Sequence, residues 1–279
     1  MSVHIDSHQH YWRYNNEEFP WITDDIKVIK RDFHANDLKP LLKNHGMYGS
    51  IAIQARLTED ENDYLLKMSD ECPDVIRGVV GWVDLTKSDV KTSLEKWSKH
   101  PKFVGVRHIV QDEPDDNYLL REDFLHGISL LKQFNLTYDI LIFHRHLKVA
   151  IEFVKKFPDQ AFVLDHIAKP DIKNHVMEPW ATDIKKLSEY KNLYCKISGM
   201  VTEANKDEPY ESFVPYLDVI FNSFGVDRIM FGSDWPVCTI NMDYSGVHSM
   251  IQRYISKYTK EEQDKILGLN AIKFYNIKI

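Results

Sequence analysis

The chain has 279 residues, of which 43% are hydrophobic, and it carries a formal net charge of −7. This length and apolar fraction allow one large domain or two smaller ones. The negative charge argues against a nucleic-acid partner, and the apolar runs are far shorter than the ~20 residues that span a membrane.

Short apolar segments typical of strands alternate with longer amphipathic segments along the whole chain. In chain order, the expected strands are residues 3–8, 50–54, 76–82, 103–107, 138–142, 162–166, 193–197 and 228–231. The expected helices between and after them are residues 37–45, 59–71, 88–100, 121–134, 147–157, 179–190, 210–224 and 244–258. Thr58 with Glu61 and Thr259 with Glu262 predict capping boxes, the second one opening a last helix, and Gly46 predicts a helix end.

Eight strands, each followed by a helical segment, predict an α/β fold with a parallel sheet. Since no linker, repeat or low-complexity stretch divides the eight units, we expect residues 1–279 to form a single-domain (β/α)₈ TIM barrel. An open, doubly wound sheet is the alternative, but no GxGxxG motif follows the first strand.

The first strand carries the segment HIDSHQH, residues 4–10. Alternate side chains of a strand point to the same face, so His4, Asp6, His8 and His10 are expected to project together into the barrel. Active sites of such barrels lie at the carboxyl ends of the strands. His8 and His10, with Cα atoms ~7 Å apart by the strand rise, would then emerge together at the catalytic end.

Polar or titratable residues also stand at nearly all of the remaining predicted strand ends. They are Gln54, Trp82, Arg107, His108, His144, His166, Lys196, Ser198 and Asp234. Each has an ordinary structural explanation: Asp234 as a turn residue or helix cap, His166 as a hydrogen-bonded core histidine. The joint placement of His8, His10, His166 and Asp234 at the strand ends favours a site instead. The histidines at 34, 45, 100, 126, 175 and 248 lie in helical or loop segments and are expected at the surface.

Five segments resemble the amidohydrolase superfamily, in the branch that opens sugar-acid lactones of the L-fuconolactone or L-rhamnonolactone type. They are residues 5–12 (IDSHQHYW), 105–108 (GVRH), 164–170 (LDHIAKP), 195–199 (CKISG) and 231–237 (FGSDWPV). The likeness covers nearly the whole chain. Pyrone dicarboxylate lactonase is a more distant relative in that branch.

The resemblance implies that His8, His10 and His166 gather around the scissile carbonyl and that Asp234 is the general base for the attacking water. It implies that Lys169 is a cationic substrate-binding residue and that Arg107 and His108 contact the substrate. Further candidates for substrate binding are Gln54, Trp82, His144 and Trp12, with Trp12, Trp21 and Trp82 as surfaces on which a sugar ring stacks.

The sequence departs from the superfamily at strand four. Two-metal members carry a lysine there, carboxylated so that it bridges the metals, whereas this strand ends in Arg107-His108. A two-metal site is therefore not expected, because arginine repels a cation. A single divalent ion, zinc, on His8, His10 and Asp234 suits the ligand types. A site that works without metal stays open.

These observations predict a lactone hydrolase with a small-molecule substrate and no nucleic-acid or membrane partner; a homo-oligomer is left open. A zinc-dependent decarboxylase of an aromatic or unsaturated carboxylic acid is the alternative on the same barrel, and a non-catalytic sugar-acid binding protein is a second one. Cys72, Cys195 and Cys238 are too dispersed for a disulfide framework. Because the first strand follows Met1 almost at once, no signal peptide is expected, and the predicted location is the cytoplasm.

Overall fold

The computed structural model describes residues 2–279, and the expected strands form one parallel sheet within them. The strands are β1 (His4–Gln9), β2 (Met47–Ile53), β3 (Ile76–Gly81), β4 (Phe103–Ile109), β5 (Thr137–Leu141), β6 (Phe162–Leu164), β7 (Leu193–Ile197) and β8 (Ile229–Phe231). They pair in sequence order from β1 to β8. Their order and direction are those of a TIM barrel.

The segment after β8 closes the barrel against β1. The backbone N–H of Asp234 donates to the His8 carbonyl at 2.8 Å, and that of His10 donates to the Trp235 carbonyl at 2.7 Å. Gln9 and Trp235 form a parallel bridge. The predicted (β/α)₈ barrel is confirmed, and its closure lies at the carboxyl end, where the site is expected.

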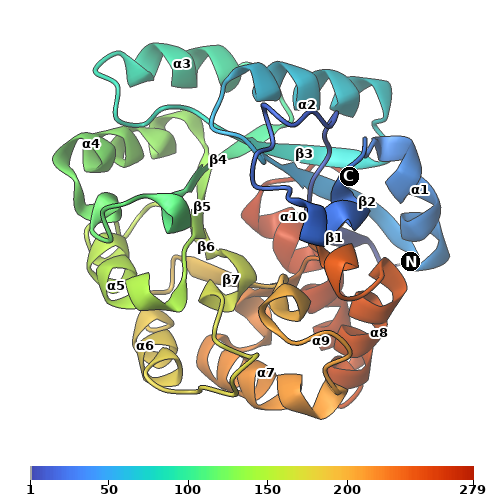
Figure 1. Cartoon of the computed structure of the whole chain (residues 1–279). Helices are drawn as coiled ribbons and strands as arrows, with labels where there is room; N and C mark the ends of the chain where they lie inside the picture. Colours follow the sequence, from blue (N-terminus) through green and yellow to red (C-terminus); the bar gives the residue numbers. More distant parts are fainter. Residues whose placement is uncertain (1) are drawn as a thin grey trace.

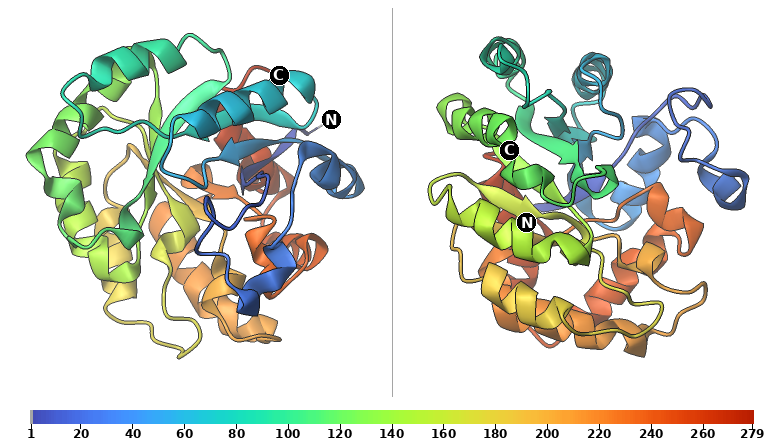
Figure 2. Two further views of the ribbon diagram at one scale, coloured as in Figure 1. Left: turned by 45° about the horizontal axis from the view of Figure 1, so that its top comes forward. Right: turned by 60° about the vertical axis from the view of Figure 1, so that its left-hand side comes forward.

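Helices surround the strands (Figures 1 and 2). They are α1 (Ala35–Asn44), α2 (Asp60–Glu71), α3 (Val90–Trp97), α4 (Glu122–Leu131), α5 (Leu147–Lys155), α6 (Trp180–Leu187), α7 (Tyr210–Phe224), α8 (Tyr244–Ile255), α9 (Lys260–Asp264) and α10 (Asn270–Phe274). Among residues 2–279, no helix has the length and apolar character needed to cross a membrane.

Two of the three predicted helix signals are confirmed. Thr259 and Glu262 form the capping box of α9, and Gly46 follows α1 with a φ of +66°, which glycine adopts readily. The capping box at Thr58 and Glu61 is wrong. The Glu61 carboxylate instead accepts hydrogen bonds from the backbone N–H groups of Ala55 and Arg56, because the loop after β2 folds back over the start of α2.

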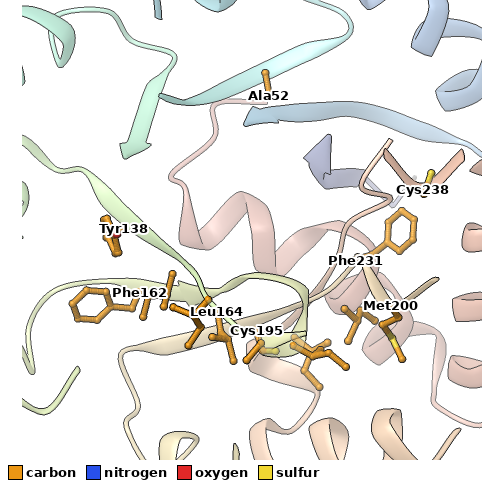
Figure 3. Packing of buried hydrophobic residues seen from close by; sticks show 14 of the residues in the cluster. Ala52, Tyr138, Phe162, Leu164, Cys195, Met200, Phe231 and Cys238 are labelled. Carbon is orange, nitrogen blue, oxygen red and sulfur yellow. The ribbon is translucent and has the colours of Figure 1, made fainter. Parts of the chain in front are cut away.

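Apolar side chains fill two layers. The outer layer lies between strands and helices; Figure 3 shows Tyr138, Phe162, Leu164 and Cys195 in it. The inner layer lies inside the barrel, where residues from β1, β2, β3, β4, β6 and β8 pack with α10 and the segment after it. α10 therefore closes the end of the barrel opposite the catalytic end.

The alternation of side chains breaks within β1. Ile5 belongs to the inner apolar layer, and the pairing of β1 with β2 is irregular between Asp6 and Gln9. Asp6 accepts hydrogen bonds from the backbone N–H groups of Ser233 at 2.9 Å and His8 at 3.2 Å. His4 contacts Asp264 at 2.8 Å.

The prediction that all four polar residues share the inner face is therefore wrong for His4 and Asp6. An irregularity of one residue shifts the phase of a strand. Residues three apart in a regular strand face opposite ways. Because of the irregularity, Ile5 and His8 both point inward.

His248 is a second correction, because it is buried rather than at the surface. It lies on α8, with its ring centroid 4.5 Å from that of His45 and 5.6 Å from that of Phe231. Burial, followed by the charge of His45, lowers its pKa from 6.5 to about 4. His126 and His175 are exposed as expected, and the others of that group are partly exposed.

Candidate active site

A cavity of about 290 Å³ opens at the carboxyl end of the barrel. It is lined by His10, Trp12, Trp21, Ala55, Arg107, Ile109, Gln111, Asp112, Leu141, His166, Lys169, Thr202, Asp234 and Val237. Seven of these are predicted site residues: His10, Trp12, Trp21, Arg107, His166, Lys169 and Asp234. Gln111, Asp112 and Thr202 carry no signal in the sequence, because they lie in loops some residues beyond the strand ends.

His8, near the end of β1, and His10, just after that strand, meet Asp234 at the floor of this cavity. Their Nε2 atoms are 3.3 Å apart, and Oδ1 of Asp234 lies 3.4 Å from Nε2 of His10 and 3.8 Å from Nε2 of His8. The carbonyl oxygen of Ile53, 2.9 Å from Nδ1 of His10, can only accept, so His10 carries its hydrogen on Nδ1. Its Nε2 therefore presents a lone pair to Asp234 and His8.

His166 and Lys169 reach the cavity from an unusual turn. Residues 166–169 all have positive φ, between 48° and 60°, which costs roughly 1–2 kcal/mol per residue without tertiary support. The predicted sixth strand therefore stops at Leu164 rather than continuing to His166. Trp180 supports the turn by donating its Nε1–H to the Ile167 carbonyl at 2.8 Å.

The loop after β7 fixes the ring of His166. Nδ1 of His166 lies 2.9 Å from the hydroxyl oxygen of Ser198. Gly199 follows with a φ of +64°, and a Cβ atom there would lie 2.4 Å from the same nitrogen. Only glycine therefore fits against the histidine.

A network of buried charges lies beneath the cavity. Nζ of Lys196 is 2.5 Å from Asp139 and 3.0 Å from Asp165, and Nη1 of Arg107 is 3.1 Å from Asp165. Sequence reasoning placed Lys196 at the end of its strand but gave Asp139, Asp165 and Lys196 no role in the site. A signal exists, since each is a charged residue within or at the end of an otherwise apolar strand.

Burial sets the charge states of this centre. It lowers the pKa of His8 well below its usual value, and the charge of Lys196 adds to the effect. Burial and neighbouring His8 act in the same direction on the pKa of His166. Burial also works against the ionisation of Asp165, but Lys196 and Arg107 outweigh it and lower the pKa of that carboxyl. At neutral pH the uncharged imidazoles of His8 and His166 thus lie beside the ionised carboxylate of Asp165.

Five predicted site residues do not line the cavity: His8, Gln54, Trp82, His108 and His144. Gln54 accepts from Nε of Arg107 at 2.8 Å, and His8 lies just beneath His10. His144 donates its Nδ1–H to the Lys169 carbonyl at 2.9 Å, which supports the left-handed turn. Their direct contact with a substrate stays a prediction.

His108 and Trp82 form a separate group. Trp82 donates its indole N–H to Nδ1 of His108 at 3.1 Å. His108 also lies 2.7 Å from a carboxylate oxygen of Glu113 and stacks on Tyr118 at a centroid distance of 4.8 Å. Since successive residues of a strand face opposite ways, His108 turns away from the barrel axis while Arg107 turns toward it.

The amidohydrolase family profile matches residues 5–277. The chain belongs to the amidohydrolase family. An L-fucono-1,5-lactonase of Burkholderia multivorans is 33% identical over 98% of this chain and 96% of its own length. The predicted membership of this family is confirmed.

Solved structures agree with this membership. The crystal structure of an amidohydrolase from Burkholderia multivorans with bound zinc is 33% identical, with a TM-score of 0.95 and coverage of 99% of this chain and 100% of that one. A probable 2-pyrone-4,6-dicarboxylic acid hydrolase from Acinetobacter baumannii is 16% identical, with a TM-score of 0.80 and coverage of 99% and 100%. At that identity the likeness shows the fold alone.

This amidohydrolase has side chains suited to one divalent ion. His8, His166 and Asp234 each offer a ligand atom within 4.8 Å of the others, and Nε2 of His10 lies within 3.4 Å of both His8 and Asp234. Three imidazoles and a carboxylate are a donor set typical of zinc. Nη1 of Arg107, 3.3 Å from Nε2 of His8, places a positive charge where a second ion would be repelled.

Proposed function

We propose that this amidohydrolase opens the ring of a sugar-acid lactone of the L-fuconolactone or L-rhamnonolactone type. The observation that carries the proposal is the contact between Asp234 and His10 at the floor of a cavity of about 290 Å³, which is large enough for a single sugar ring. The curated relative at 33% identity, named for L-fucono-1,5-lactone, supports the substrate class.

Lactone hydrolysis needs a base for water and hydrogen-bond donors for the carbonyl oxygen. In the proposed reaction Asp234 takes a proton from water as its oxygen attacks the carbonyl carbon. His166 and Arg107 line the same cavity and stabilise the charge on the carbonyl oxygen. The bond to the ring oxygen then breaks, and Asp234 returns the proton to the leaving alkoxide. His8 and His10 lie beside Asp234 and would polarise the carbonyl by holding a divalent ion.

The walls of the cavity suit a polyhydroxylated ring. Trp12 and Trp21 line one side, with ring centroids 6.0 Å apart and planes at 85°, and give apolar surface for the face of a sugar. Nζ of Lys169 lies 3.8 Å from Glu203. Lys169 lines the cavity and offers a donor to ring hydroxyls.

A divalent ion, if held, would lie on His8, His10 and Asp234, with His166 close enough to take part. Such an ion supplies a Lewis acid for the carbonyl and lowers the pKa of bound water. The roles proposed for Asp234 as the base and for His166 and Arg107 as hydrogen-bond donors do not require this ion. The cytoplasmic location and the homo-oligomer stay predictions.

A substrate panel tests the proposal. Sugar 1,4- and 1,5-lactones and aromatic carboxylic acids would be assayed with and without a chelator, following acid release for the lactones and CO₂ release for the acids. We expect turnover of sugar lactones and none of the aromatic acids. CO₂ release that ceases on chelation would establish the decarboxylase instead. Binding of a lactone without turnover would establish the binding protein.

A further inference from the structure

Lys196 is a completely buried ammonium group at the centre of the barrel. Its Nζ has three N–H groups and three neighbours that can accept them: Asp139 at 2.5 Å, Asp165 at 3.0 Å and Nδ1 of His8 at 3.2 Å. An ammonium group only donates. The contact with His8 is therefore a hydrogen bond only if Nδ1 carries the lone pair.

His8 faces a cation at both ring nitrogens. Lys196 lies at Nδ1, and Nη1 of Arg107 lies 3.3 Å from Nε2. A neutral imidazole has one lone pair and one N–H, so it can accept from only one of the two cations. The position of the single ring hydrogen decides which contact is satisfied.

Burial favours Lys196 as the donor. Without His8 one of its N–H groups would be left without an acceptor in a fully buried place, and an unsatisfied buried donor on a charged group is costly. Arg107 lines the cavity and already donates to Gln54 and Asp165. Its remaining N–H groups can meet water or substrate there.

His10, which lies at Nε2 of His8, fits the same arrangement. With the lone pair on Nδ1, His8 carries its hydrogen on Nε2, and Nε2 of His10 lies 3.3 Å away. His10 keeps its own hydrogen on Nδ1 for the Ile53 carbonyl, so its Nε2 accepts. Hydrogen bonds then run in one direction, from Lys196 through His8 to His10.

We propose that Lys196 is a positioning residue that holds His8 with its hydrogen on Nε2 and thereby opposes a divalent ion at that nitrogen. A metal ligand needs its lone pair on the coordinating atom. To bind through Nε2, His8 must move its hydrogen to Nδ1, where it faces Nζ of Lys196 at 3.2 Å and Oδ1 of Asp165 at 3.5 Å. The Lys196–His8 bond and a metal on His8 therefore exclude each other, whatever the substrate is.

Nitrogen NMR of the metal-free wild-type protein tests this directly. With ¹⁵N-labelled histidine, long-range ¹H–¹⁵N spectra distinguish protonated from unprotonated ring nitrogens, and a His8→Asn variant assigns the signal. We expect His8 to show an unprotonated Nδ1 and a protonated Nε2. The opposite pattern would overturn the proposal, and this measurement needs no folded variant of Lys196.

A double variant tests the consequence for metal. Lys196→Met with Asp139→Asn removes one positive and one negative charge together. Tyr275→Phe is the matched control, because it removes the 2.8 Å hydrogen bond to Asp139 but leaves Lys196 and His8 in place.

In the double variant we expect the hydrogen of His8 on Nδ1. We also expect zinc affinity, by competition with a chelating dye, to rise about 10- to 100-fold, the range for residues that contact metal ligands. The control should match the wild type in both readouts. A folded double variant with unchanged tautomer and unchanged zinc affinity would refute the role of Lys196.

Discussion

Asp234 is held at the mouth of the barrel by its backbone as well as by its neighbours. It has a φ of +59°, which is uncommon outside glycine. Its N–H donates to the His8 carbonyl, and its own carbonyl accepts from Cys238, both at 2.8 Å. These bonds offset the strain and aim the carboxylate at His10. The side chain is thus placed by the fold rather than by a flexible loop.

The Asp234→Asn variant tests whether Asp234 is the general base. The amide keeps the shape but cannot accept the proton of water, so we expect kcat to fall about 10²- to 10⁴-fold, the usual effect of losing general base catalysis. Lactone binding, followed by calorimetry, and the circular dichroism spectrum should stay as in the wild type. An Asn variant that turns over lactone within a few-fold of the wild type would make Asp234 a structural turn residue.

Between elements, the loop after β7 and the left-handed turn after β6 position His166 together. The turn sets the direction of the side chain, and Ser198 and Gly199 pack against its ring. The loop can approach so closely because Gly199 has no side chain. The orientation of His166 therefore depends on two segments that are separate in sequence.

Gly199→Ala should displace His166. A Cβ atom at Gly199 would lie 2.4 Å from Nδ1, whereas one at Gly46, with nearly the same φ, would meet nothing within 4 Å. Both variants carry similar backbone strain, about 1 kcal/mol, measurable as the free energy of unfolding in urea. Only Gly199→Ala should lose kcat/KM, by about 10- to 100-fold, since small misplacements of site residues are costly. Equal activities in the two variants would remove His166 from the reaction.

His45, just after α1, contacts His248 on α8. This contact predicts that acid lowers the stability of the folded protein through His248. Its pKa falls from 6.5 to about 4 in the folded protein, through burial and then His45 and His4. Between these values the unfolded chain takes up a proton that the folded chain does not, so stability falls as pH decreases through this window.

His248→Gln should flatten this dependence, measured as the free energy of unfolding in urea between pH 7 and pH 4. His126→Gln, at an exposed position on α4, is the control and should leave the slope unchanged. A His248 variant with the wild-type slope would show that another group controls the acid response.

For the whole molecule, the barrel brings all eight strand ends to one place, so the charges on each strand influence the others. β4 contributes Arg107, which pairs with Asp165 and lies beside His8. That positive charge stands at the strand where two-metal members of the superfamily carry a bridging lysine. It limits how much positive charge the centre can accept from bound ions.

We therefore expect at most about one equivalent of divalent ion per chain. Protein loaded with zinc and then dialysed would be analysed by plasma mass spectrometry, with Arg107→Gln as a comparison. Two zinc ions at full occupancy in the wild type would contradict this reading of β4.

Much of the fold and part of the site follow from the sequence by itself. The alternation of strand and helix patterns determines a (β/α)₈ barrel, because each pattern depends on residues close in the chain. A barrel of parallel strands necessarily gathers their carboxyl ends at one mouth. The positions of His10, His166 and Asp234 at three of those ends are therefore enough to predict that they share a cavity.

Only the tertiary structure decides which side chains at those ends face one another. The phase of β1 depends on its pairing with β2, so the periodic pattern at residues 4–10 does not reveal that Asp6 faces away from His8. Lys196 meets His8 across 188 positions of sequence. Such a contact exists because the closed barrel brings β7 and β1 to a common axis, and no local pattern of residues encodes that distance.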